Sequence, residues 1–407
     1  MKCSKPAVLL SLFFIGFLHA TIFQFLEYPE NFFTSELPAY LKKTSVVAVS
    51  SIAIINAFAT PWLAKIYGLK KYLIFGLWAY LIGLVLFTLS NYTQNAFWLV
   101  LVILFASGLF AVAFSSVIIN LITYVLLEMP KHFGIGVALL FAFMNTGGLI
   151  SPFLLDWFKS WQNGWILTTG LAAFLLLAIG GIHLFFPEPV YPKKLQIFRK
   201  DTLIWQKMHY RFLLFMLAII LYGVCENTFN LWGHLYVQSL FSKATAHHLI
   251  SLFWLFLILG QLLVLTPMLL FSNFRVFFIL VSLILISLFF LPVQKDLNII
   301  RVLFMVAGLG CSACFPILLS LLETEITNLA KDSHSPVVPY LEFSSAYIVG
   351  GYLIGISLIG MKIEFSENIT ALHIVKNFHY TTLACLALLG TVVFLGKTKL
   401  KNTIYKF

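Results

Sequence analysis

Residues Tyr72 to Leu127 read YLIFGLWAYLIGLVLFTLSNYTQNAFWLVLVILFASGLFAVAFSSVIINLITYVLL and contain no charged side chain. The hydrocarbon core of a bilayer is about 30 Å thick, so one spanning helix needs about 20 apolar residues. The run is too long for one such helix and fits two, divided at the polar cluster Asn91-Tyr92-Thr93-Gln94-Asn95. In lipid, each backbone polar group must bond inside its own segment, so the run predicts α-helices.

The rest of the chain continues this pattern. Of its 407 residues, 61% are apolar and only 10% are charged, which is too few to cover a soluble domain. We therefore expect an all-α membrane protein with twelve transmembrane helices. The uncharged runs place the spans near 7–27, 44–64, 72–90, 96–124, 133–157, 164–186, 210–240, 247–271, 274–293, 299–322, 337–361 and 377–396.

The basic residues fit a membrane better than a nucleic acid. A net charge of +11 would suggest nucleic acid in a soluble protein. Here the Lys and Arg residues lie in short loops, and most of them fall on one side if the N-terminus is cytoplasmic. We expect a multi-pass protein of the cell inner or plasma membrane with both termini cytoplasmic, contact with lipid and no nucleic-acid partner.

A basic hydrophilic stretch from Pro187 to Arg211 separates six predicted spans from the next six. Its prolines discourage a continuous helix, and its lysines favour an anionic inner leaflet. We interpret the stretch as a tether. The expected organisation is an N-terminal six-helix half over 1–187, a cytoplasmic linker over 188–209 and a C-terminal six-helix half over 210–407.

The two halves show a weak internal repeat. Leu126-Leu127-Glu128 recurs as Leu321-Leu322-Glu323, and paired glycines follow each of them, at Gly147-Gly148 and Gly350-Gly351. Many secondary transporters are built by duplication of such a unit, with the substrate site near the midplane where the repeats meet. The repeat favours transport over catalysis.

The loop after the second predicted span resembles the signature of the major facilitator superfamily. It reads Pro61-Trp62-Leu63-Ala64-Lys65-Ile66-Tyr67-Gly68-Leu69-Lys70-Lys71 and keeps the glycine and the terminal basic pair. Lys65 stands where the family has an acidic residue. The resemblance implies the major facilitator fold, in two six-helix halves, and a gating role for Lys65, Gly68, Lys70 and Lys71.

Within that family, four places are similar to the fucose–proton symporter branch: Leu221 to Asn227, Gly310 to Leu319, Asn120, and Phe143 to Gly148. By the same alignment, two carboxylates that the branch links to sugar binding and proton movement fall near Gln24 and Ser116, and both are absent. The resemblance therefore implies a sugar-like solute but does not carry over the coupling residues.

Glu226 is the only acidic residue in the middle of a predicted span. An ionised carboxylate in lipid costs a few kcal/mol, so it usually faces a water-filled cavity or a partner. On an α-helix, Glu226, Asn230 and His234 share a face. We interpret Glu226 as a substrate or proton site; the alternative is a protonated glutamate bonded to a neighbouring helix.

His19 lies in the middle of the first span, and an imidazole exchanges protons near neutral pH. The family places spans one and seven beside the central cavity, so the resemblance allows a His19–Glu226 proton couple. A neutral histidine that only bonds another helix is an equal alternative.

Neutral polar side chains in the spans suit a ligand that bears hydroxyl groups, because they bond it without a buried charge. Each can instead bond helix to helix. Trp232, deep in span seven, is a candidate stacking platform for a ring. The predicted substrate site comprises Glu226, Asn227, Asn230, His19, Gln24, Asn120, Asn145, Trp232 and Gln261.

For three further residues we favour a structural role. Glu342, near the inner end of span eleven, is interpreted as an interface carboxylate; the alternative is a gating role in which it pairs with Lys331 or Lys131. Cys311 and Cys314 lie in an apolar run and are expected to be inert thiols. No catalytic triad, phosphate loop or metal-ligand motif is found, so we expect no enzyme activity, no cofactor and no metal.

These observations predict a secondary active transporter that moves a small polar solute by alternating access, with protons coupled through Glu226. We expect it to be a monomer. The first alternative is a proton-independent facilitator or exchanger of amino acids or other small metabolites. The second is a non-transporting membrane sensor.

Overall fold

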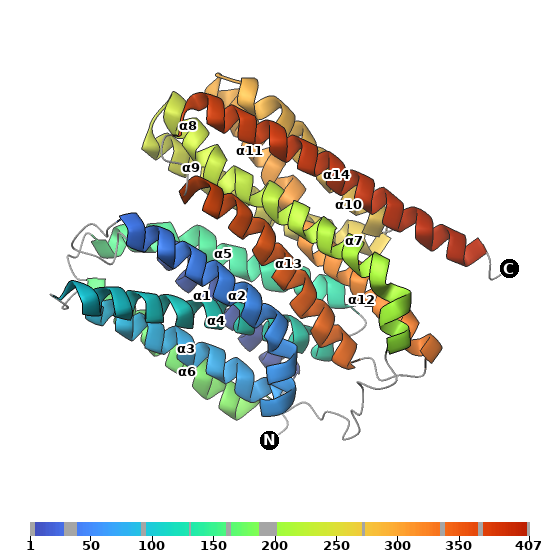
Figure 1. Ribbon diagram of the computed structural model, residues 1–407, viewed down its shortest axis with the longest axis horizontal. Coiled ribbons are helices and arrows are strands. Elements are labelled where there is room, and N and C mark those ends of the chain that lie inside the picture. Colours follow the sequence, from blue (N-terminus) through green and yellow to red (C-terminus); the bar gives the residue numbers. More distant parts are fainter. Residues whose placement is uncertain are drawn as a thin grey trace. The chain divides into compact units, whose positions relative to one another are not determined.

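The computed structural model describes the backbone of residues 5–27, 39–90, 95–129, 132–159, 164–186, 202–270, 273–333, 338–364 and 369–404. These residues form helices joined by short connections and contain no β-strand (Figure 1). The chain divides into two compact units, Met1–Pro189 and Val190–Phe407. The division falls at the start of the predicted linker.

Among the residues that the structure describes, the first unit holds six helices, one for each predicted span. They are α1 (Lys5–Glu27), α2 (Ala39–Tyr67), α3 (Leu69–Ser90), α4 (Ala96–Glu128), α5 (Phe133–Lys159) and α6 (Gly164–Phe185). Asn95 caps α4, because its side chain accepts hydrogen bonds from the backbone N–H groups of Phe97 and Trp98. The polar cluster therefore separates α3 from α4, where the sequence predicted a break.

The second unit also has six spans, three of them irregular. The helices are α7 (Thr202–Asn227), the π-helix η3 (Thr228–Gly233), α8 (His234–Leu240), α9 (Lys243–Leu270), α10 (Asn273–Phe290), the 3-10 helix η4 (Leu291–Val293), α11 (Leu297–Cys311), α12 (Cys314–Ser333), α13 (Val338–Glu364) and α14 (Ala371–Ile404). Helix α7 begins at Thr202, inside the predicted linker 188–209, so the last part of that linker is helical.

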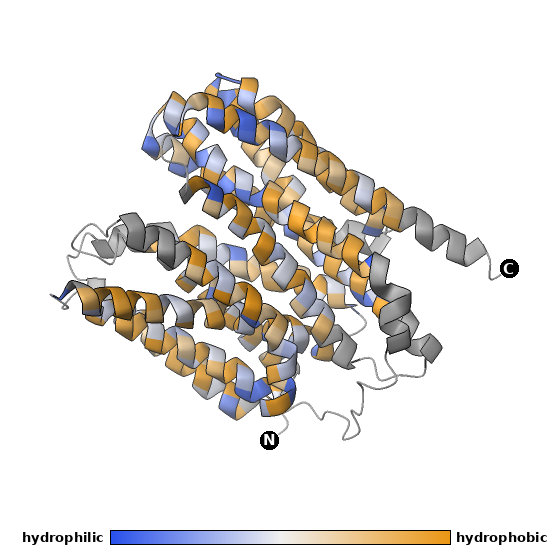
Figure 2. Cartoon of the chain, viewed as in Figure 1, coloured by the Kyte–Doolittle hydropathy of each residue, from blue (hydrophilic) through white to orange (hydrophobic). Residues whose placement is uncertain are grey.

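The described residues contain ten helices or continuous helical stretches that are long and apolar enough to cross a membrane. Two shorter apolar helical stretches, Pro6–Ile22 and Thr169–Leu184, belong to the first and sixth spans. Hydrophobic residues extend along the helices, and hydrophilic residues gather at many of their ends (Figure 2). The prediction of a twelve-helix membrane protein is confirmed.

Close helix pairs repeat between the units. In the first unit α1 packs on α5, and in the second α7 packs on α13. Glycines permit both contacts: a Cβ atom at Gly147 would collide with the carbonyl of Phe17, and one at Gly355 would collide with that of Ile220. Small residues of this kind let helices approach closely in lipid.

Two irregular places in the second unit interrupt its α-helices. The π-helix η3 follows Asn227, and a break at Ser312 and Ala313 separates α11 from α12. Pro316 lies just beyond the break and has no N–H to donate to the carbonyl four residues earlier. Both irregular places flank the α7–α13 contact that carries the candidate site.

We expect Gly355→Ala to destabilise the protein, because the added methyl group would meet the Ile220 carbonyl and lie 3.1 Å from the Gly223 Cα atom. Overpacking of this kind costs about 1–3 kcal/mol. Gly360→Ala, in the same helix, is the control, because nothing lies within 4 Å of its added Cβ. Thermal unfolding of the purified variants compares them; equal midpoints would contradict the tight α7–α13 contact.

Candidate functional site

Glu226 lies in the last turn of α7 and is 5% exposed. The Tyr352 hydroxyl, from α13, donates a hydrogen bond to the Glu226 Oε1 atom at 3.0 Å. The carboxyl group therefore points into the second unit and away from lipid. This contact agrees with an interhelical bond and also with a proton site, because both interpretations require a buried carboxyl group.

Tyr222, one turn before Glu226, supports the backbone beside this site. The Tyr222 hydroxyl donates its proton to the Cys311 carbonyl at 2.8 Å. The Tyr352 hydroxyl can donate to Glu226 in either protonation state, because the acid and the carboxylate both keep an oxygen that accepts. The Tyr352 contact is therefore compatible with a carboxyl group that gains and loses a proton.

Aromatic rings surround this carboxyl group. The rings of Tyr222 and Tyr352 stack with centroids 6.1 Å apart, and Phe315 meets Tyr352 edge-on at 5.4 Å. The described residues place no cation against Glu226. The sequence interpretation missed both tyrosines, although Tyr222 stands four residues before Glu226 and Tyr352 directly follows the paired glycines.

The polar residues after Glu226 contact different neighbours. The Asn227 amide donates to the Ile356 carbonyl at 2.9 Å, so it ties α7 to α13. The Thr228 hydroxyl lies 3.0 Å from that of Thr381 on α14. The predicted polar stripe of Glu226, Asn230 and His234 assumed α-helical spacing. The π-helix η3 has wider turns, so side chains on either side of it no longer follow that spacing. Glu226 and Asn230 are thus separated by a change of helix type.

Two predicted site residues within η3 hold buried polar atoms without hydrogen-bond partners among the described residues. They are the Asn230 Oδ1 atom and the Trp232 Nε1 atom. Trp232 is 1% exposed, so its ring lies inside the second unit. Buried polar atoms are usually satisfied, and those that are not point to a bound molecule, water or ion.

His19 lies in the core of the first unit, 1% exposed. Its Nδ1 atom lies 2.9 Å from the Tyr80 hydroxyl on α3, and its ring stacks on Phe114 of α4 at 4.9 Å. The Nε2 atom is buried and has no hydrogen-bond partner among the described residues. The Tyr80 contact gives His19 the helix-to-helix bond that the sequence left as an alternative, while Nε2 stays available for a ligand or proton.

Asn120 differs from the hydroxyl residues on its helix. Its side chain is fully buried, and both amide atoms lack hydrogen-bond partners among the described residues. The Ser116 and Thr123 hydroxyls instead bond the α4 backbone, at the carbonyls of Ala113 and Ile119. Ser116 and Thr123 are therefore satisfied by their own helix, whereas the Asn120 amide still needs a polar partner.

The remaining predicted residues are less informative. Asn145 in α5 is half-buried and Gln261 in α9 is buried, and each interacts with a neighbour. The Gln24 side chain lies outside the described residues. His19 belongs to the first unit and Glu226 to the second, so their predicted couple stays a prediction.

The predicted gating loop joins α2 to α3 through Gly68, whose φ of 92° is a left-handed conformation that favours glycine. The Lys70 ammonium donates to the carbonyls of His183 and Phe186 at 3.1 and 2.9 Å. It thereby caps the end of α6. Lys65 and Lys71 are exposed, and the Glu342 side chain lies outside the described residues.

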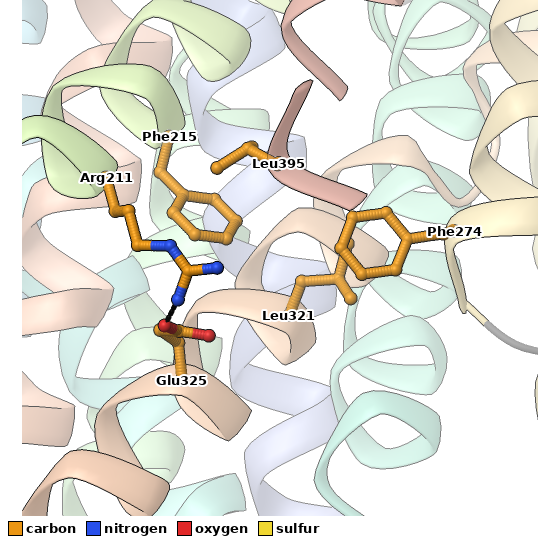
Figure 3. Close-up of a pocket in the computed structure, with 6 residues that line it drawn as sticks. All are labelled: Arg211, Phe215, Phe274, Leu321, Glu325 and Leu395. Atoms are coloured by element: carbon orange, nitrogen blue, oxygen red, sulfur yellow. Dashed lines mark ion pairs between the residues drawn. The ribbon is translucent and has the colours of Figure 1, made fainter. Parts of the chain in front are cut away.

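An ion pair that the sequence did not predict lies near the start of span seven. Arg211 of α7 pairs with Glu325 of α12 (Figure 3). Their side chains are only 10% and 17% exposed. They line a small pocket together with the apolar residues Phe215, Phe274, Leu321 and Leu395. The pair fastens α7 to α12 at the end of span seven that follows the linker.

We expect Arg211→Gln to destabilise the protein by about 1–2 kcal/mol, because it leaves the partly buried Glu325 carboxylate without this cation. Arg275→Gln is the matched control, since Arg275 is exposed at the start of α10. Thermal unfolding of both variants measures the difference. If the two substitutions cost the same, the ion pair does not fasten α7 to α12.

The fold and the buried polar sites define a polytopic α-helical membrane transporter. The family model of the Major Facilitator Superfamily matches residues 8–333. The chain belongs to this superfamily, and membership identifies it as a transporter and not an enzyme. No curated protein sequence matches it.

Solved structures share the fold over nearly the whole chain. A major facilitator transporter, FucP, in the outward conformation has a TM-score of 0.72 at 15% identity and covers 96% of this chain and 98% of its own. The Escherichia coli fucose:proton symporter FucP gives 0.69 at 16% identity, covering 96% and 99%. The human organic anion transporter MFSD10 (TETRAN) gives 0.70 at 12% identity, covering 96% and 99%. The predicted resemblance to the fucose–proton symporter branch is confirmed for the fold.

Proposed function

We propose that this protein is a secondary active transporter that moves a small, hydroxyl-bearing solute by alternating access and couples it to protons through Glu226. The solute is sugar-like, and the two six-helix halves, 1–187 and 210–407, rock about a midplane site. The observation that carries the proposal is the buried Glu226 carboxyl group, which accepts a hydrogen bond from the Tyr352 phenol and has no cation beside it among the described residues.

Proton binding is supported by the burial of Glu226. The carboxyl group is 5% exposed and the described residues place no cation against it, so ionisation leaves an uncompensated charge inside the unit. The Tyr352 hydroxyl can donate to the acid and to the carboxylate. A cycle that protonates Glu226 on one side of the membrane and releases the proton on the other uses this difference in charge.

Each half offers neutral groups to the solute that we propose. Asn120 and His19 in the first half and Asn230 in the second each present a buried atom that lacks a hydrogen-bond partner among the described residues. A molecule with several hydroxyl groups can donate to and accept from such atoms without adding a charge. Trp232, two residues after Asn230, offers an apolar ring and an N–H that has no partner among the described residues.

One observation favours the alternative of a proton-independent facilitator or exchanger. The position that aligns with the branch's span-four carboxylate is Ser116, which is buried and bonded to its own backbone. That position cannot take up a proton in this chain. Glu226 would then act only as an interhelical link, and amino acids or other small metabolites would be candidate solutes.

We expect Glu226→Gln to abolish solute accumulation driven by a pH gradient while solute exchange at equal pH continues. The amide keeps the shape and the Tyr352 contact but cannot gain or lose a proton. Proteoliposomes with and without an inward proton gradient measure both activities, once a solute has been found by thermal-shift screening of sugars, amino acids and nucleosides.

Tyr352→Phe is the matched control for this measurement, because it removes the hydrogen bond and leaves the proton site. We expect it to keep accumulation at a reduced rate. Gradient-driven accumulation by Glu226→Gln at the level of the unchanged protein would exclude coupling through Glu226 and favour the facilitator.

We expect Asn120→Leu to weaken solute binding at least tenfold and to leave stability unchanged or higher. Removing a buried amide that has no partner removes its desolvation cost, about 1–3 kcal/mol, in the empty protein. Thr123→Val is the control, because that hydroxyl already bonds the Ile119 carbonyl. Solute-induced shifts in thermal unfolding report both effects; destabilisation by Asn120→Leu with unchanged solute binding would show a structural role.

A further inference from the structure

Two histidines face each other at the far end of span seven from Arg211. His234 is the first residue of α8, and His247 lies near the start of α9, which packs against α8. Their ring centroids are 4.8 Å apart, with 55° between the ring planes. The sequence interpretation placed His234 on a polar stripe with Glu226 and did not pair it with another histidine.

The His234 Nε2 atom is buried and has no hydrogen-bond partner among the described residues. A neutral imidazole carries a lone pair on one of its two ring nitrogens. A cation can satisfy a lone pair of this kind where no donor reaches it.

The ring separation fits one metal ion held between the two imidazoles. A Zn–N bond of about 2.0–2.1 Å puts the metal about 3.2 Å from each ring centroid. Two rings bound at angles between about 90° and 110° then have centroids about 4.5–5.2 Å apart. The observed 4.8 Å lies inside that range. Simple stacking of the two rings gives no reason for the buried His234 Nε2 atom to be without a hydrogen-bond partner among the described residues.

We propose that His234 and His247 form a binding site for a divalent transition-metal ion of the Zn²⁺ class. Imidazole nitrogens select such ions over Mg²⁺ and Ca²⁺, which prefer oxygen ligands. The described residues hold no group of three or more His, Cys, Asp or Glu side chains that could share a metal. The site is therefore an open one, in which water completes the coordination.

Access and affinity follow from the surroundings. His247 is exposed, so the ion reaches the pair from outside the unit, while His234 is half-buried behind it. Lys243, at the start of α9, lies within electrostatic range of His234 and opposes a second positive charge. Two imidazoles beside a lysine make a reversible site and not a permanent structural one. A bound ion would clasp α8 to α9.

The test is titration of Zn²⁺ against the purified full-length protein at pH 7.5, with thermal unfolding as the readout. We expect the unfolding midpoint to rise and saturate, and a chelator to reverse the rise. His247→Ala removes the effect and, because the side chain is exposed, leaves the core intact. His248→Ala is the matched control: this neighbour is also exposed and keeps the full response.

Isothermal titration of the same three proteins with Zn²⁺ gives the stoichiometry, with one ion per chain expected for the unchanged protein and for His248→Ala. His247→Ala should weaken binding at least tenfold, and His234→Ala should do the same if it folds. Saturable binding that survives His247→Ala, or none at all in the unchanged protein, overturns the proposal. No solute flux is measured, so the outcome is independent of the proposed transport function.

Discussion

The described spans depend on one constraint: in hydrocarbon there is no water to bond a backbone N–H or C=O group. Continuous α-helices meet it throughout the first unit. The second unit departs from the continuous α-helix at η3 and at the break after Cys311, and both places lie beside Glu226. There the Tyr222 hydroxyl bonds the Cys311 carbonyl, so a side chain supports the interrupted backbone. The candidate proton site thus lies where the helices are least regular.

The same constraint separates structural polar side chains from those that await a ligand. Ser and Thr hydroxyls in the spans mostly bond a carbonyl of their own helix, as Thr60 does with Asn56. Asn56 itself is satisfied by Ser115 and Tyr72, in a network that joins three helices. Against that background Asn120 is an exception, because its side chain is fully buried and neither amide atom has a hydrogen-bond partner among the described residues.

The sequence predicted the twelve spans well, because a run of apolar residues of bilayer length permits few other structures. Glu226 was also predictable, since a carboxylate is rare within a span. Its hydrogen-bond partner was not: Tyr352 stands in an apolar run, where a tyrosine usually serves packing. The π-helix η3 has no sequence signature, and the pairs Arg211–Glu325 and His234–His247 join residues whose meeting depends on how separate helices pack.

Lys70 belongs to the loop that carries the family signature, which this chain alters at Lys65. Its ammonium group is held by two carbonyl oxygens at the end of α6, within the first unit. Lys65, where the family has an acid, removes a natural counterion from the same loop. A lysine anchored by main-chain carbonyls needs no such counterion, so Lys70 stays satisfied although the acid is absent. Lys71 is exposed, and the described residues give it no such anchor.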